Sequence, residues 1–279
     1  MRRPEDIKAR MGNIEQVEGV VVAMRALAAA HAQEAKKHLV AIREQEATVA
    51  RAMVDALALL DTPLHAPAEP ATGKHLRIVV GAAQGFSGSY SERIVSGAMA
   101  DEGTAPSTTY LLIGQRCLSE FESRGVSPVW SAHMAAHAAE VPALASRVVD
   151  AAFALLGKGA FTHVSIVYGE PEGSGQTLTI RQLMPFDFTR FETASRPFPP
   201  LVTIAPAVLV TRLVEEYVFT EICEALMLGF SAENDARMTA MSRARSNVRQ
   251  IREELRREFA QARQEQTTTE IIELSDDAD

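Results

Sequence analysis

At 279 residues, the chain is long enough for one large domain or two ordinary ones. Its 47% hydrophobic and 23% charged residues are typical of a soluble, folded protein. A net charge of −8 argues against nucleic-acid binding over the whole surface, although it leaves room for a local basic patch. The basic N-terminus lacks the apolar run of a signal peptide, and no apolar run reaches the roughly 20 residues that span a bilayer. We therefore predict a cytoplasmic protein that does not insert directly into a membrane.

The two cysteines, Cys117 and Cys223, lie far apart in the sequence and show no CxxC pairing. We expect buried or idle thiols in a reducing compartment rather than a disulfide.

The first sixty residues predict one long helix. Pro4 suits the first turn of a helix, and the chain has no further proline until Pro63. Stepping alternately by three and four residues gives a heptad seam typical of a left-handed coiled coil. This seam consists of Ile14, Val17, Val21, Met24, Ala28, His31, Ala35, His38, Ile42, Gln45, Val49, Ala52, Ala56 and Leu59. Its polar members suit a helix whose middle also faces something else; an ordinary long surface helix is the alternative.

The middle of the chain changes to short apolar runs that alternate with helical segments, between proline-rich links at 61–73 and 196–206. Strands are expected at 76–80, 109–113, 164–168 and 177–183, and helices at 90–100, 115–123 and 141–156. This alternation predicts a βαβ-type domain with a mostly parallel sheet.

The C-terminal segment predicts a second long helix, because residues 207–273 contain no proline and a single glycine, Gly229. At about 1.5 Å per residue, such a helix is roughly 100 Å long and needs a partner of similar length. We therefore predict a long antiparallel coiled coil of the two terminal helices around a central α/β (Rossmann-like) domain. The predicted division is 1–62 for the first helix, 63–204 for the α/β domain, and 205–279 for the second helix and an acidic tail.

A row of arginines follows one face of the second helix: Arg245, Arg249, Arg252 and Arg256, at spacings of four, three and four. Local pairs such as Arg249 with Glu253 fit a solvated charged face. The alternative is that this arginine stripe faces an acidic partner surrounding the helix pair.

The sequence does not match the catalytic and metal-binding motifs that its glycines and histidines suggest. Residues 81–88 (GAAQGFSG) follow a strand but lack the Gly-Lys-Ser/Thr ending of a phosphate-binding loop, so a tight strand-to-helix turn is expected. His133 and His137 have the spacing of a zinc-binding helix, yet Met134 stands where HExxH requires glutamate. We assign no catalytic residue, cofactor or metal.

Both ends of the chain resemble the γ subunit of F-type rotary ATP synthases. Residues 7–24, with Ile7, Arg10, Met11, Ile14 and Ala23-Met24, are similar to the opening helix of that family. Residues 231–241 (SAENDARMTAM) resemble its SE-x-x-ARM-x-AM signature, and residues 262–270 (ARQEQTTTE) its ARQ-x-x-I-T-x-E ending. Gly85, Gly88 and residues 182–185 agree more loosely.

The resemblance implies a central rotor shaft without a catalytic site or cofactor of its own. It implies a pair of terminal helices inserted through a ring of three α and three β subunits, with catalysis in β. The α/β domain would form a foot that contacts ε and the membrane c-ring, peripheral to the inner (plasma) membrane. By position, Met24 and Arg237 match family residues at the lower contact with the ring, and Gln264 and Thr268 match residues higher up.

Several departures favour a divergent branch, such as the shaft of a second, alternative rotary ATPase. The valines at 20–22 replace a polar, lysine-bearing stretch, and Ala83-Gln84 replaces the usual Asp-Arg before the glycine turn. The coupled ion and the direction of turnover stay open. A coiled-coil adaptor or dimerisation protein with a ligand-binding α/β domain is the alternative function, and a stand-alone α/β enzyme is the weakest.

Overall fold

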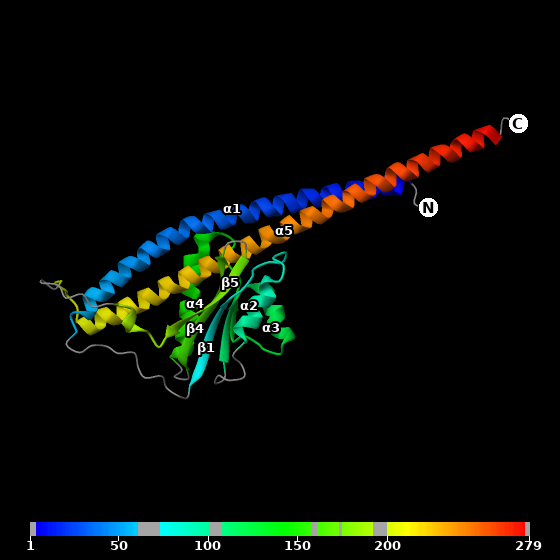
Figure 1. Cartoon of the computed structure of the whole chain (residues 1–279). Coiled ribbons are helices and arrows are strands. Elements are labelled where there is room, and N and C mark those ends of the chain that lie inside the picture. Colours follow the sequence, from blue (N-terminus) through cyan, green and yellow to red (C-terminus); the bar gives the residue numbers. More distant parts are fainter. Residues whose placement is uncertain are drawn as a thin grey trace. The chain divides into compact units, whose positions relative to one another are not determined.

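The structure is a computed structural model that describes residues 4–60, 73–100, 108–157, 161–172, 175–191 and 200–276. Residues 61–72 and 196–199 of the predicted links, and residues 277–279 of the acidic tail, lie outside these ranges. The elements in chain order (Figure 1) are α1 (Pro4–Leu57), β1 (Lys74–Val80), α2 (Tyr90–Ala98), β2 (Thr108–Ile113), α3 (Gln115–Ser123), β3 (Trp130–Ala132), η1 (Ala138–Glu140), α4 (Val141–Leu156), β4 (Phe161–Glu172), β5 (Gly175–Met184), η2 (Phe188–Arg190) and α5 (Pro206–Asp276).

The chain divides into two compact units, which are described separately. The helical unit contains Met1–Ala29 and Arg237–Asp279, and the sheet unit contains Ala30–Ala236. Each long helix contributes residues to both units. The division into 1–62, 63–204 and 205–279 stays a prediction.

The five strands form one sheet in the order β3-β2-β1-β4-β5. β1 pairs in parallel with β2 and β4, β2 pairs in parallel with β3, and only β5 runs antiparallel, beside β4. The expected mostly parallel sheet is therefore confirmed, as are its four predicted strands. β3 was not predicted, because its three residues are too few to show a period.

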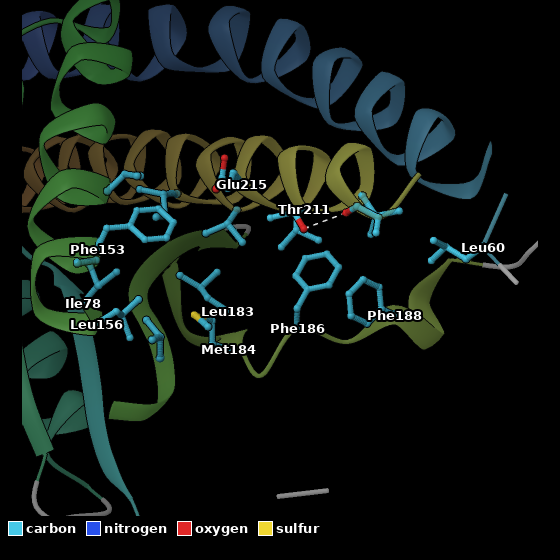
Figure 2. A pocket seen from close by; sticks show the side chains of 18 residues that line it. Leu60, Ile78, Phe153, Leu156, Leu183, Met184, Phe186, Phe188, Thr211 and Glu215 are labelled. Atoms are coloured by element: carbon cyan, nitrogen blue, oxygen red, sulfur yellow. Dashed lines mark hydrogen bonds between the residues drawn. The ribbon is translucent and has the colours of Figure 1, made fainter. Parts of the chain in front are cut away.

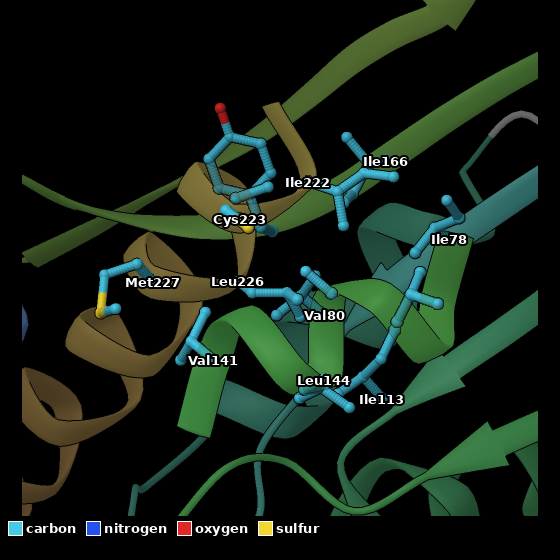
Figure 3. Close-up of a cluster of buried hydrophobic side chains, with 14 of the residues drawn as sticks. Ile78, Val80, Ile113, Val141, Leu144, Ile166, Ile222, Cys223, Leu226 and Met227 are labelled. Atoms are coloured by element: carbon cyan, nitrogen blue, oxygen red, sulfur yellow. The ribbon is translucent and has the colours of Figure 1, made fainter. Parts of the chain in front are cut away.

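Helices cover both faces of the sheet, which is why the strands read as continuous apolar runs. On one face, α4 and α5 pack over alternate residues of β1, β2 and β4 (Figure 3). On the other face, α2 and α3 cover the intervening residues, Val79, Tyr110, Leu112 and Val167. The side-chain alternation of a strand thus supplies two hydrophobic cores.

α5 is buried on all sides within the sheet unit, since every residue from 220 to 234 is buried. Gly229 permits this close packing: a Cβ added there would lie 2.5 Å from Cγ1 of Val80 on β1. The glycine that interrupts the predicted helix is therefore a contact point with the sheet.

α1 and α5 run antiparallel in the sheet unit. Moving forward along α1 from Arg43 to Gln45 and Glu46, the hydrogen-bond partners move back along α5 from Glu224 to Glu216 and Tyr217. Near the end of α1, Val49, Met53 and Ala56 pack with Phe186, Phe191, Val210 and Tyr217. The predicted combination of an antiparallel pair of terminal helices with a central α/β domain is confirmed.

The predicted seam of α1 is half wrong. One column is correct, because Val21, Ala28, Ala35, Val49 and Ala56 are buried at multiples of seven residues. The other column lies one residue further on, at Glu18, Ala32, Leu39, Glu46 and Met53, while the expected members Val17 and Gln45 are exposed. Both columns contain small or apolar residues, so the heptad pattern alone does not choose between them. The polar positions His38 and Gln45 therefore flank the seam.

In the helical unit, α5 repeats the same heptad spacing, with Met241, Val248 and Leu255 buried. Glu18 of α1 forms ion pairs with Arg249 and Arg252 of α5 and places the two helices side by side. Within the described ranges, none of the helices combines the length and apolarity that crossing a bilayer requires.

Candidate functional site

All eight predicted contact residues lie in the helical unit: Met24 on α1, and Arg237, Arg245, Arg249, Arg252, Arg256, Gln264 and Thr268 on α5. Met24 is half-buried and Arg237 is buried, whereas Gln264 and Thr268 are exposed. The set therefore divides into inner positions, which shape the helix pair, and outer positions, which a partner is able to touch.

The arginine stripe is partly neutralised within the chain. Nη1 of Arg252 donates a hydrogen bond of 2.6 Å to Oε2 of Glu18, and Nε of Arg249 lies 3.6 Å from Oε1 of the same carboxylate. Glu18 was not among the predicted residues. Its position four residues after Ile14 places it on the same helix face as Ile14. Val17 fits the heptad equally well, so the sequence alone does not single out Glu18.

The two ends of the stripe differ from its middle. Among the described residues, Arg256 is exposed and Arg245 is half-buried, and neither forms an ion pair. The Nε atoms of Arg245 and Arg252 are both buried with no hydrogen-bond partner. Arg249 keeps about half of its side chain exposed. Within the stripe, the positive charge available to a partner is therefore concentrated at Arg256, with a smaller contribution from Arg249.

Gln264 and Thr268 lie near the C-terminal end of α5, which extends to Asp276. The Thr268 hydroxyl donates to the backbone carbonyl of Gln264 at 2.9 Å. Both line a shallow surface with Phe259, Ala260, Arg263 and Thr267. An amide, two hydroxyls, a guanidinium and an aromatic ring suit hydrogen bonding to a neighbouring protein.

In the sheet unit, the loop after β1 is held by an internal carboxylate. Glu233 of α5 is buried and accepts hydrogen bonds from the backbone N–H groups of Ala83 (2.9 Å) and Gln84 (3.2 Å). These are the amides that a bound phosphate would use. The loop therefore serves to fix α5 against the sheet, in line with the expected strand-to-helix turn.

The histidine pair His133 and His137 lies in the loop between β3 and η1, so the four-residue spacing of a zinc helix does not apply. The His137 ring instead packs edge-on against His31 of α1, with 5.8 Å between ring centroids. Among the described residues, no group of three or more His, Cys, Asp or Glu side chains is arranged to hold a metal ion. Cys117 and Cys223 are both free and buried, as expected.

An apolar pocket of about 450 Å³ lies between α4, α5 and the end of β5 (Figure 2). Its two polar lining residues are already engaged: the Thr211 hydroxyl donates to the Ala207 carbonyl at 3.0 Å, and Glu215 pairs with Arg212 at 2.8 Å. Among the described residues that line this pocket, no convergent set of reactive groups is present, so these walls offer packing and no chemistry.

Comparison with known proteins adds family information to this geometry. A family model described as ATP synthase matches residues 3–278. The ATP synthase gamma chain of Salinibacter ruber is 26% identical, and the alignment covers 100% of this chain and 98% of that protein. The gamma chain of Bdellovibrio bacteriovorus is 24% identical, covering 97% and 96%.

Solved structures agree in fold. The rotor of the Euglena gracilis mitochondrial ATP synthase aligns with a TM-score of 0.64 at 14% identity, covering 95% of this chain and 98% of that one. A chain of the Euglena assembly containing OSCP, F1 and c-ring aligns with a TM-score of 0.67 at 14% identity, covering 99% and 93%.

Proposed function

Because this chain belongs to the γ-subunit family of F-type ATP synthases, we propose that it is the central shaft coupling ion-driven rotation of a membrane ring to ATP synthesis or hydrolysis. The γ subunit is a non-catalytic rotor subunit, and the chemistry takes place in the β subunits. One copy of the chain would assemble with three α and three β subunits, an ε subunit and the c-ring. This complex would lie on the cytoplasmic side of the inner (plasma) membrane.

The observation that carries this proposal is the apolar surface of the helical unit. Val17, Val20 and Leu27 of α1 are 46%, 58% and 59% exposed. The helical unit consists of one segment of α1 and one of α5, and α5 leaves these three side chains uncovered. Exposed apolar residues that follow one side of a helix are typical of a protein contact. Since Met24 lies among them in the helical sequence, the predicted contact at Met24 would be part of a broader apolar stripe.

The outer arginines support an electrostatic part of the same contact. Arg256 is exposed and unpaired among the described residues, so its charge is available to acidic groups of a surrounding subunit. Rotation of an asymmetric shaft would present such groups to each catalytic subunit in turn and change nucleotide affinity there. This is a coupling between binding free energies, so the shaft needs no reactive group of its own.

Reconstitution with candidate α and β subunits tests the proposal. We expect one copy per three α and three β subunits, together with ATP-driven rotation. The alternative, a coiled-coil adaptor or dimerisation protein, predicts a homodimer that binds neither subunit.

Charge reversal tests the arginine contribution. Arg249→Glu with Arg252→Glu should slow or uncouple ATP hydrolysis, but this double change also breaks both ion pairs with Glu18. Arg256→Glu is cleaner because it breaks no ion pair in the described part of the chain. Arg257→Glu is the matched control, since it makes the same charge change at an adjacent exposed position about 100° around the helix. Equal effects of the two single variants would remove the role of the stripe.

A further inference from the structure

Besides Glu233, α5 carries two buried carboxylates that the proposed function does not use. Glu221 is 1% exposed and Glu224 is 5% exposed, and both lie in the stretch of α5 enclosed by the sheet unit. Glutamate is almost never buried to this degree unless its charge is paired. The arginines that pair with Glu221 and Glu224 therefore identify the elements to which these carboxylates link α5.

Glu224 joins two elements that are distant in the sequence. Its Oε1 accepts a hydrogen bond of 2.9 Å from Nε of Arg43 on α1, and its Oε2 accepts one of 2.8 Å from Nη1 of Arg181 on β5. The guanidinium of Arg181 also lies over the ring of Tyr168 on β4, 5.6 Å from the ring centroid. One carboxylate thus bridges the first helix and the edge strand of the sheet.

Glu221 extends the connection by one helical turn. Its Oε1 accepts a hydrogen bond of 3.0 Å from Nη1 of Arg190 in η2 and lies 3.8 Å from Nη1 of Arg181. Arg190 also donates to the Tyr217 hydroxyl at 3.2 Å, and that hydroxyl donates to Glu46 of α1 at 2.8 Å. Three acids and three arginines, named here the charge network, are therefore linked: Glu46, Glu221, Glu224, Arg43, Arg181 and Arg190.

The charge network supplies a property that the surrounding core lacks. Apolar contacts are non-directional. Hydrogen-bonded ion pairs in a shielded site require one geometry. A buried ion pair contributes little net stability compared with a well-packed apolar pair. What it offers instead is a fixed register between the elements it joins.

We propose that the charge network is a torsional lock between the sheet and the α1–α5 helix pair, an inference that rests on the proposed function. Torque applied to the strands of the sheet unit passes to α5 through Arg181 and Glu224, and to α1 through Glu224 and Arg43. These side chains are positioning residues. Their role is to keep the helices from turning relative to the sheet under load.

The lock is tested in an α3β3γ complex by attaching a bead to Ser119→Cys, an exposed position on α3, and recording angular fluctuations while the head is held fixed. Glu224→Gln keeps the volume of the side chain and removes its charge. We expect the variance of the bead angle to rise about twofold, because directional links to both α1 and β5 are weakened. Arg212→Gln, which disrupts an exposed pair on the same helix, is the control and should leave the variance unchanged.

A second variant separates locking from ordinary stabilisation. Replacing both partners, as Arg181→Met with Glu224→Met, removes the ion pair without leaving either charge buried alone, so resistance to unfolding should largely recover. The lock predicts that the bead variance stays high in this double variant. Variance that returns to the wild-type value together with stability would overturn it.

Load provides a further readout. ATP hydrolysis by the unloaded α3β3γ complex should be unchanged in Glu224→Gln, whereas ATP-driven ion pumping by the whole complex should fall by about half, since only pumping transmits torque through the sheet. If Glu224→Gln does not assemble, Arg43→Gln is the alternative variant. It removes the link between Glu224 and α1, and it should disturb the core less because the Arg43 side chain is about half exposed. Unchanged pumping and variance in an assembled variant would contradict the lock. Failure of the wild-type chain to assemble would instead contradict the proposed function.

Discussion

Glu18 of α1 binds Arg252 of α5 across 234 positions of sequence, with 2.6 Å between Oε2 and Nη1. The side chain of Glu18 is only 15% exposed, so its carboxylate is largely shielded from solvent. The pair fixes which residues of the two helices face each other in the helical unit. It also removes Arg252 from the charge that is free to meet a partner.

A double-mutant cycle of Glu18→Gln and Arg252→Gln should give an interaction free energy of about 1 kcal/mol, the upper range for partly exposed pairs. Urea unfolding at low and high salt is the measurement, and the interaction should weaken as salt rises. The exposed pair Arg212–Glu215 should give less than half of this value. Equal values for the two pairs would show that shielding at Glu18 has no energetic consequence.

Gly229→Ala should destabilise the chain by about 1–3 kcal/mol, because the added Cβ would lie 2.5 Å from Cγ1 of Val80 and force α5 away from β1. Gly19→Ala is the matched control, since nothing lies within 4 Å of its added Cβ. This control change should stabilise α1 by about 0.5–1 kcal/mol. Thermal unfolding of both variants measures the contrast. A stabilising Gly229→Ala would show that the close packing is not required.

Glu233→Ala should cost about 2–3 kcal/mol, because two backbone N–H groups, those of Ala83 and Gln84, lose the carboxylate that accepts from them. Hydrogen exchange at these two amides should become faster. Asp235→Asn on the same helix is the comparison: burial raises the pKa of Asp235, so loss of its charge should be neutral or slightly stabilising at pH 7. Protected amides in Glu233→Ala would rule out the anchoring role of this carboxylate.

Neither cysteine should react with a thiol reagent in the folded protein at pH 8. Burial raises the pKa of Cys117 to about 11 and that of Cys223 to about 12, so the thiolate population is small, and both side chains are inaccessible. Reaction should begin only as the protein unfolds. The Ser119→Cys variant should label at once, which verifies the reagent. Rapid labelling of the wild-type chain would contradict the observed burial.

Glu224 and Glu221 should affect stability with opposite dependence on pH. Burial raises the pKa of Glu224, but hydrogen bonds from Arg181 and Arg43 outweigh it and hold the pKa below its ordinary value of 4.5. Its stabilising contribution is therefore complete above pH 4.5 and is lost as the pH falls through the lower folded value. Burial dominates at Glu221 and raises its pKa, so its contribution is complete below pH 4.5 and is lost as the pH rises.

The measurement is the free energy of unfolding between pH 3 and pH 7 for wild type, Glu224→Gln and Glu221→Gln. The stability gap between wild type and Glu224→Gln should narrow toward low pH. Toward low pH, the free energy of unfolding of wild type should increase relative to that of Glu221→Gln. If the free energy of unfolding depended on pH in the same way in all three proteins, the pKa shifts of Glu221 and Glu224 would be refuted.

Much of the fold was predictable from local pattern. The helices at 115–123 and 141–156 match α3 and α4 in the structure, and the four expected strands lie within β1, β2, β4 and β5. Their period and their turn residues are properties of neighbouring positions in the chain. β3 escaped this reading because three residues contain no period.

The candidate contact set was only partly predictable. The spacing of Arg245, Arg249, Arg252 and Arg256 places them on one face of a helix whatever the fold. Which of them keeps its charge free depends on Glu18, more than 200 residues away, so no local pattern contains the answer. The charge network was missed for the same reason, since Glu221 and Glu224 resemble ordinary surface glutamates until the sheet encloses α5.

By itself, the sequence determined the two long helices, the alternation that builds a parallel sheet, and the terminal motifs of the γ family, since each depends on residues close together in the chain. Only the tertiary structure decided which column of α1 faces α5, because Ala32 and Leu39 compete with positions one residue earlier that fit a heptad equally well. It also decided that α5 is enclosed by the sheet and that its buried acids are paired. The physical reason is that burial and charge compensation depend on contacts between distant segments, and these contacts exist only after the chain has folded.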